Sequence, residues 1–279
     1  MKHIDIHTAV GKNNPQQADT LAIVLTNGGY SFCTANAKPP FQISRLLSHS
    51  FPNHWEHLSP VEQFDWLKTQ HKDLQGQFKR VFIAYDSPRV TLIPTAIYRD
   101  GTGTDYFELV FGPTQNEQLH RDSLSTLELE VISAFPIGWL GATAVQFHDV
   151  KVTTVAASVC QRLSRHNSGS KENRLYLHIQ GNSLSCWQYN SSQLLAHNRF
   201  FVATGEDILY YANLLAKQEA HELFYFGDGD FCQKALPLLL SYFNKVEVLQ
   251  SENLIAFDAQ LTTLDPADLQ LLYACLCAS

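Results

Sequence analysis

Hydrophobic and polar positions change their period along the second half of the chain in an order that few folds use. Three alternating apolar runs, joined by short polar turns at QGN and NSS, predict three consecutive strands between residues 175 and 202. A helical period, a short strand, a second helix and a last strand follow up to residue 249. The predicted segments are LYLHI, SLSCWQY, LLAHNRFFV, EDILYYANLLAKQEA, LFYF, an apolar helix and KVEVL.

The first half repeats this scheme more loosely. TLAIVLT, Tyr30 to Thr34 and Phe41 to Leu47 predict a three-strand meander whose first hairpin turns at Asn27-Gly28-Gly29, residues that tolerate a positive φ. A helix over Val61 to Leu74 and the strand RVFIAY follow.

A local signal marks the start of that helix. Ser59 is an expected N-cap, Pro60 suits the first helical position, and Glu62 completes a capping box. The helix is therefore predicted from the capping signals at its amino terminus as well as from its hydrophobic period.

An inserted region follows in the first half. VTLIPTAIY, YFELVFG and LELEVISAFP predict further strands, IGWLGATAVQF predicts a helix, and VKVTTV predicts a strand that runs into a helix over AASVCQRL. The polar segment HNSGSKEN has no apolar period and marks a boundary, which gives domains over residues 1–170 and 171–279. The order β-β-β-α-β-α-β in each half predicts an α/β fold with mixed sheets, built from two ribonuclease-H-like domains as in actin-like ATPases.

Composition limits the function. A chain of 279 residues with 45% hydrophobic residues can bury two ordinary cores. A net charge of −7 without a basic stripe argues against nucleic-acid binding, because neutralised phosphates supply most of that affinity. No apolar run is long enough to span a membrane, and the amino terminus lacks a secretory core, so a cytoplasmic protein without membrane insertion is expected.

The six cysteines fit that location. Cys33, Cys160, Cys186 and Cys232 lie in apolar stretches, where reduced thiols behave as small hydrophobic side chains. The C-x-C pair near the carboxyl terminus has no further ligands at metal-binding spacing. No metal site is predicted.

Several segments resemble one known family. DSPRVTLIPTAIY, LLAHNRFFVATGEDILYYANLLAKQE and LFYFGDGDFCQKALPLLLSYFNKVEV are similar to an uncharacterised bacterial family, domain of unknown function 3822, found mostly in Bacteroidetes. The phrase N-R-F-x-x-x-T-x-E-D-x-L-Y-Y, from Asn198 to Tyr211, is the most specific part. The resemblance implies an actin-like ATPase fold and no established activity.

Actin-like nucleotide sites use a glycine hairpin from each domain, with acidic residues for Mg²⁺ or the attacking water. Here Leu25 or Thr26 stands where the first acidic residue is expected, and His178 stands at the second. Without a carboxylate, phosphoryl transfer loses much of its charge stabilisation. The sequence predicts a degenerate nucleotide site with no catalytic residues, although an enzyme is not excluded.

The third element of such sites, a glycine-rich turn between a strand and a helix, matches the expected pattern more closely. Gly227-Asp228-Gly229-Asp230 joins a strand to a helix, with Asp230 as an expected N-cap. Backbone amides at five glycines are the candidate nucleotide contacts, although each is equally explained by turn geometry: Gly28, Gly29, Gly181, Gly227 and Gly229. No cofactor is required, and ATP with Mg²⁺ remains compatible with these glycines.

We therefore expect a non-catalytic binding or assembly module with a protein partner. The alternative is an ATP-dependent phosphotransferase or ATPase that uses Asp86, Asp228 or Asp230. A small-molecule sensor without hydrolysis lies between the two. The oligomeric state is not predicted.

Four other segments are interpreted structurally. Asp5-Ile6-His7-Thr8 is expected in a surface arm, and the stretch DGTGTD at residues 100–105 in a hairpin turn that precedes no helix. Thr204 and Asp207 predict a capped helix, with Arg199 able to pair with its acidic start. A last helix is predicted to open at Asp265 and to pack Leu269, Leu272 and Leu276.

Overall fold

The computed structural model describes residues 7–10, 19–26, 28–36, 41–216, 222–227, 229–249 and 255–256. This part of the chain forms two compact units. Unit 1 contains the described residues up to Val159 together with the strand β15 (Ile255–Ala256), and unit 2 contains those from Cys160 onward. No helix in these ranges is long and apolar enough to cross a membrane. The division between the units falls within the helix Val155–Asn167, whereas the predicted domain boundary at residue 170 lies after that helix. The domain boundary stays a prediction.

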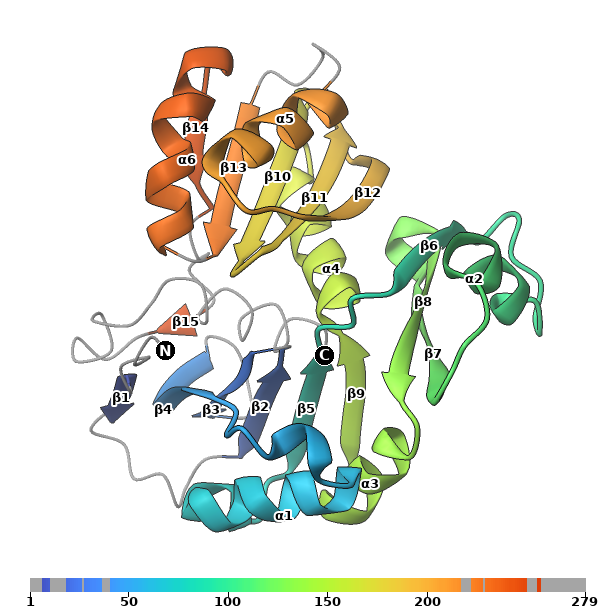
Figure 1. Cartoon of the computed structure of the whole chain (residues 1–279), viewed down its shortest axis with the longest axis vertical. Coiled ribbons are helices and arrows are strands. Elements are labelled where there is room, and N and C mark those ends of the chain that lie inside the picture. The colour runs from blue at the N-terminus through green and yellow to red at the C-terminus, as the bar shows by residue number, and fades with distance from the viewer. Residues whose placement is uncertain are drawn as a thin grey trace. The chain divides into compact units, whose positions relative to one another are not determined.

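Unit 1 is built on a mixed sheet with the order β1-β4-β3-β2-β5-β9, in which β15 also pairs with β4 (Figure 1). The strands β2, β3 and β4 form the predicted antiparallel meander, and β5 and β9 add in parallel beside β2. Every residue of β2 is buried, as expected for a central strand covered on both faces. The bounds are β1 His7–Val10, β2 Thr20–Leu25, β3 Gly29–Ala35, β4 Phe41–Ser50, β5 Arg80–Tyr85 and β9 Val150–Thr154.

Two helices cover one face of this sheet, α1 (Pro60–Gln70) and α3 (Trp139–Gln146), and Figure 1 shows them side by side. Phe64 and Trp139 pack their rings 5.3 Å apart in the core between the helices and the strands. The predicted capping box opens α1, because Ser59 and Glu62 each accept the other's backbone N–H. The predicted start of α1 is therefore confirmed.

The inserted region forms a separate three-stranded antiparallel sheet with the order β6-β8-β7, where β6 is Val90–Pro94, β7 is Glu117–Leu124 and β8 is Leu129–Pro136. The strand predicted at YFELVFG is wrong, because α2 covers Gly103–Phe111. The turn predicted at DGTGTD is wrong for the same reason, since its last residues enter this helix. Helical spacing places Phe107 against Ile93 and Ile132, where it is fully buried.

The expected amino-terminal surface arm is also wrong in part. Residues 7–10 form β1, an outer strand that pairs antiparallel with β4. The strand β7 was not predicted, because its sequence EQLHRDSL is polar and only its last residue is buried. Cross-strand pairing with β8 holds it in place.

Unit 2 has the order β12-β11-β10-β13-β14, which repeats the scheme of unit 1 without an insertion. The predicted meander, crossover helices and parallel strands are all present. The bounds are α4 Val155–Asn167, which begins in unit 1, then β10 Asn173–Gln180, β11 Ser183–Asn190, β12 Gln193–Phe201, α5 Gly205–Ala216, β13 Glu222–Gly227, α6 Gly229–Tyr242 and β14 Val246–Val248.

The two faces of the unit 2 sheet have different chemistry. One face buries aliphatic side chains such as Leu177 and Ile179 against α5 and α6. The other is aromatic: Tyr176 stacks on Phe224 at 5.2 Å, and its hydroxyl is 2.7 Å from the Nδ1 atom of His166 on α4. Helices therefore cover both faces, as an α/β architecture requires.

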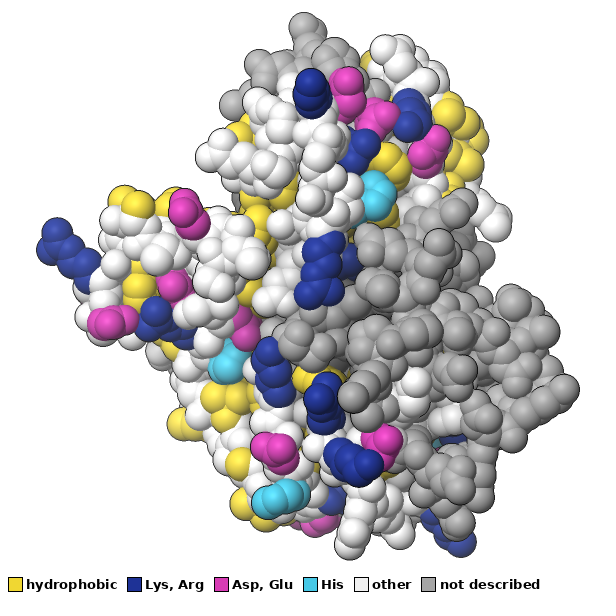
Figure 2. Space-filling view, turned by 180° about the vertical axis from the view of Figure 1, so that it is seen from behind, with side chains coloured by type: hydrophobic (Ala, Val, Ile, Leu, Met, Phe, Trp, Pro, Cys, Tyr) yellow, Lys and Arg dark blue, Asp and Glu magenta, His cyan; other side chains and the backbone are white. Residues whose placement is uncertain are grey.

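The described cysteines are buried thiols that form no disulfide, as predicted: Cys33, Cys160, Cys186 and Cys232. Burial raises the pKa of the Cys33 and Cys160 thiols to about 12. On the face drawn in Figure 2, basic and acidic side chains both occur and lie next to one another in several places. The last predicted helix, from Asp265, lies outside the described residues.

Candidate functional site

The first glycine hairpin, at the end of β2, is held by its own backbone. Thr26 donates its N–H to the carbonyl of Gly29 at 2.9 Å and its hydroxyl to the same oxygen at 3.1 Å. A Cβ on Gly29 would lie 2.2 Å from the carbonyl oxygen of His49, whereas a Cβ on Gly28 would meet nothing within 4 Å. Gly29 is thus required by strand packing, and Gly28 faces open space. Neither has a positive φ.

An acidic residue follows a neighbouring strand, and its backbone is hydrogen-bonded to the end of β2. Asp86, directly after β5, donates its backbone N–H to the carbonyl of Leu25 at 2.8 Å and is only 7% exposed. The parallel register of β2 and β5 brings these two strand ends together. Asp86 is a candidate residue of the alternative ATPase from the sequence, but its position beside the hairpin depends on strand register and has no local sequence signal.

A cavity of about 680 Å³ opens at the same edge of the unit 1 sheet. Gly28 and Thr26 of the hairpin belong to its wall, whereas Asp86 does not. Most of the described lining residues are apolar or aromatic, yet polar atoms form about half of the exposed wall, and Glu56 is the one charged residue among them. The lining residues are Leu25, Thr26, Gly28, Phe51, Pro52, Asn53, Trp55, Glu56, Leu58, Pro60, Gln63, Tyr85, Asn116, Pro136, Ile137 and Trp139.

The glycines predicted in unit 2 meet at one sheet edge. β10 and β13 are parallel, with Ile179 opposite Gly227, so Gly181 follows β10 where Gly227 ends β13 and Gly229 begins α6. A Cβ on Gly227 would lie 1.9 Å from the carbonyl oxygen of Ile179, and its φ is +127°. Gly181 has a φ of +52° and no neighbour within 4 Å of a Cβ. Strand packing alone therefore requires Gly227.

His178 occupies the position of the second expected acidic residue. It is 3% exposed, and its ring stacks on Phe226 at 4.8 Å. The guanidinium of Arg162 lies 5.8 Å from the centre of the same Phe226 ring. Asp228 lies outside the described residues, and Asp230 is described only in its backbone, within the first turn of α6 rather than at its cap.

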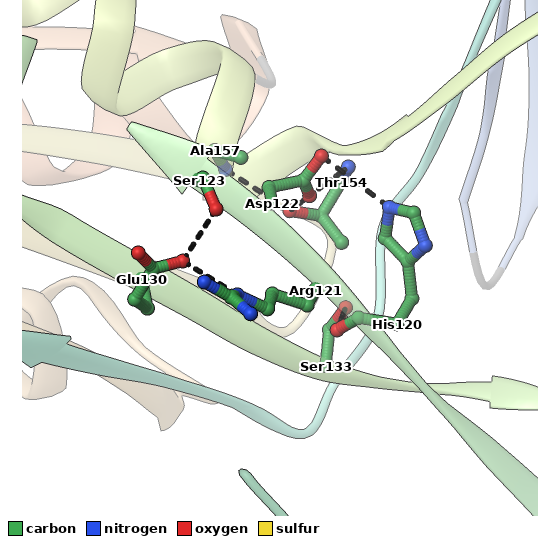
Figure 3. Close-up of polar contacts among 8 residues, drawn as sticks. All are labelled: His120, Arg121, Asp122, Ser123, Glu130, Ser133, Thr154 and Ala157. Atoms are coloured by element: carbon green, nitrogen blue, oxygen red, sulfur yellow. Dashed lines mark hydrogen bonds and ion pairs between the residues drawn. The ribbon is translucent and has the colours of Figure 1, made fainter. Parts of the chain in front are cut away.

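A second cluster of polar side chains in unit 1 was not predicted (Figure 3). Asp122 accepts hydrogen bonds from the N–H and the hydroxyl of Thr154, both at 3.1 Å, and Thr154 in turn accepts the N–H of Ala157. The His120 ring lies 3.3 Å from the other Asp122 oxygen. The cluster joins β7 to the start of α4, and it caps that helix.

The opposite side of β7 carries an ion pair, because successive strand residues alternate between faces (Figure 3). Glu130 accepts hydrogen bonds from Arg121 at 2.8 Å and from Ser123 at 2.6 Å. The Arg121 hydrogen bond, more than that of Ser123, lowers the pKa of Glu130, so the carboxylate stays ionised. The Asp122 cluster ties the inserted sheet to the start of α4, and the Glu130 cluster ties β7 to β8, which accounts for a strand that is polar in sequence.

Two residues of the family-like phrase form the predicted helix cap. Thr204 and Asp207 form the predicted cap of α5, with Asp207 accepting the N–H groups of Ala203 and Thr204 at 2.8 and 2.9 Å. Arg199 donates to the hydroxyl of Ser183 at 2.7 Å. Across the described residues, no group of His, Cys, Asp and Glu side chains is arranged to hold a metal ion.

Comparison with known proteins gives the fold a context. Residues 12–246 match the sequence model of a family described as protein of unknown function (DUF3822), and no curated protein matches. A Bacteroides thetaiotaomicron protein, described as having an actin-like ATPase fold and unknown function, matches with a TM-score of 0.78 and 19% identity over 95% of this chain and 100% of that one. A chain of a PilM–PilN type IV pilus biogenesis complex matches with a TM-score of 0.64 and 13% identity, over 93% and 98%.

These likenesses establish the predicted actin-like ATPase fold with mixed sheets. The source of the Bacteroides structure agrees with the bacterial phylum that the resemblance implied.

Proposed function

We propose that this protein acts as a non-catalytic binding or assembly module. The chain belongs to the family described as protein of unknown function (DUF3822), and it has an actin-like ATPase fold. One observation carries the proposal. The two hairpin strands present Thr26 and His178 where Mg²⁺-dependent hydrolysis needs carboxylates. His178 is also occupied in a ring stack with Phe226.

The glycines support the same proposal. Gly29 and Gly227 are each explained by the close approach of a neighbouring strand, with no need for a ligand. Gly28, Gly181 and Gly229 remain candidates for weak nucleotide contacts through backbone amides. The proposed module works in the cytoplasm with a protein partner, and the PilM–PilN complex among its structural neighbours is one example of such a partnership in this fold.

The alternative, an ATP-dependent phosphotransferase or ATPase, is favoured by one specific observation. Asp86 is a buried carboxylate whose backbone is bonded to Leu25 at the first hairpin. A carboxylate there can orient water or hold Mg²⁺ through water. A small-molecule sensor that binds without hydrolysis is the third possibility.

An assay of phosphate release separates these functions. Purified protein with ATP and Mg²⁺ is expected to release phosphate no faster than a buffer blank. The matched variants are Asp86→Asn and, as a control on the exposed side of α2, Asp105→Asn. Turnover that disappears in Asp86→Asn and persists in Asp105→Asn would replace the proposal with the phosphotransferase. A nucleotide-dependent rise in melting temperature without turnover would support the sensor.

A further inference from the structure

The cavity of unit 1 has the size and position of a binding site. It opens at the carboxyl ends of β2, β4 and β5, the edge of an α/β sheet at which ligands usually bind. Its volume of about 680 Å³ lies within the range of sites that hold a small ligand or a few side chains. Trp55 and Phe51 stack at 4.0 Å in its wall, which gives the wall a rigid aromatic surface.

The charges around the cavity argue against an anionic ligand. No Lys or Arg belongs to the lining residues, and Glu56 is their one charged member. Among the described lining residues a phosphate group would meet one carboxylate and no cation, whereas a basic group would be attracted.

One exposed apolar side chain belongs to the wall of the cavity. Ile137, in the turn before α3, lines the cavity and is 63% exposed. An exposed apolar side chain in the wall of a cavity is typical of an interaction surface.

We propose that unit 1 docks a peptide segment of a partner protein through this cavity. The segment places a bulky apolar side chain against Trp55 and Phe51, a neighbouring Lys or Arg near Glu56, and a further apolar side chain on Ile137. The Glu56 carboxylate and the absence of a cation among the described lining residues select this chemistry over a nucleotide. The inference deepens the proposed function, on which it rests for the partner being a protein.

The test is a selection of random dodecapeptides displayed on phage against the full-length protein. Enriched peptides are expected to pair a bulky apolar residue with a Lys or Arg, and their affinity should fall as salt rises. In binding measurements, Ile137→Asp and Glu56→Lys should each weaken a selected peptide by about tenfold or more. Leu109→Asp and Glu108→Lys, both exposed on α2, are the matched controls and should leave binding unchanged.

A second cavity variant provides an independent test if Ile137→Asp does not fold. Asn53 is an exposed lining residue, so Asn53→Arg adds a positive charge to the cavity without removing a buried contact. It should also weaken the peptide. Failure to enrich any peptide, equal binding by cavity and control variants, or displacement of the peptide by ATP would each overturn the inference. Phosphate release, measured on the same samples, tests the proposed function separately.

Discussion

Gly227 offers the sharpest test of whether the predicted glycines serve packing or ligand binding. In Gly227→Ala the new Cβ would lie 1.9 Å from the carbonyl oxygen of Ile179, and the residue would keep a φ of +127°. An L-residue at such a φ costs about 1–2 kcal/mol. Strand β13 must also move away from β10, which breaks pairing at the end of the ladder at roughly 0.5–1.5 kcal/mol per hydrogen bond.

We therefore expect Gly227→Ala to lower the free energy of unfolding by about 3 kcal/mol. Gly181→Ala is the matched control, because Gly181 has a φ of +52° in a turn with open space around it. Only the backbone penalty applies there, about 1 kcal/mol. Urea denaturation followed by circular dichroism measures both values. Equal losses in the two variants would refute the packing argument and return Gly227 to the list of ligand contacts.

Three further predictions address other parts of the molecule. Burial, with smaller contributions from His49 and Arg45, lowers the pKa of His71 to about 4, so stability should be complete above pH 6.5 and decrease as the pH falls toward 4. The loss should be about 1–3 kcal/mol after solvent screening, and His71→Phe should flatten this slope in urea titrations at several pH values. Asp207→Ala removes the α5 cap and should lower the melting temperature by about 2–4 °C, and an unchanged value would show that packing alone fixes the start of the helix. Trypsin should cut first at the exposed Lys171, giving fragments that divide near residue 170, and a first cut elsewhere would contradict the predicted domain boundary.

Much of the fold could be predicted from the sequence, because its elements carry local signals. The meander of unit 2 alternates with period two, and the start of α1 carries a complete capping box at Ser59 and Glu62. The capped start of α5 was predicted for the same reason. These signals are encoded within a few residues and survive in any tertiary context.

The inserted region was harder because its signals are short or non-local. YFELVF is a short segment with five apolar residues out of six, which fits either a strand or a helix, and the buried position of Phe107 against β6 and β8 favours the helix. β7 is polar, and its side chains are satisfied by residues far along the chain, such as Glu117 with Arg89 and Asp122 with Thr154. No local pattern records those partners.

The candidate site was predicted only in part, for a similar reason. The glycines of the hairpins are visible in the sequence, but the tight passage of Gly29 past His49 depends on strand register. The cavity draws residues from the ends of several strands and from the starts of α1 and α3. Asp86 is placed at the first hairpin only by the hydrogen bond from its backbone N–H to the carbonyl of Leu25, which no local sequence pattern predicts.

The position of the inserted sheet has a consequence for the order of folding. β5 and β9 are neighbours in the unit 1 sheet, yet residues 86–149 separate them. Closing a flexible loop of that length costs roughly 4 kcal/mol in chain entropy. Ser87 donates to the carbonyl of Ala134 at 2.7 Å, so an inserted sheet that forms first already holds its two ends together. If the inserted sheet forms first, it shortens the loop that must close before β9 pairs with β5, and replacing it by a flexible linker is then expected to slow the completion of unit 1.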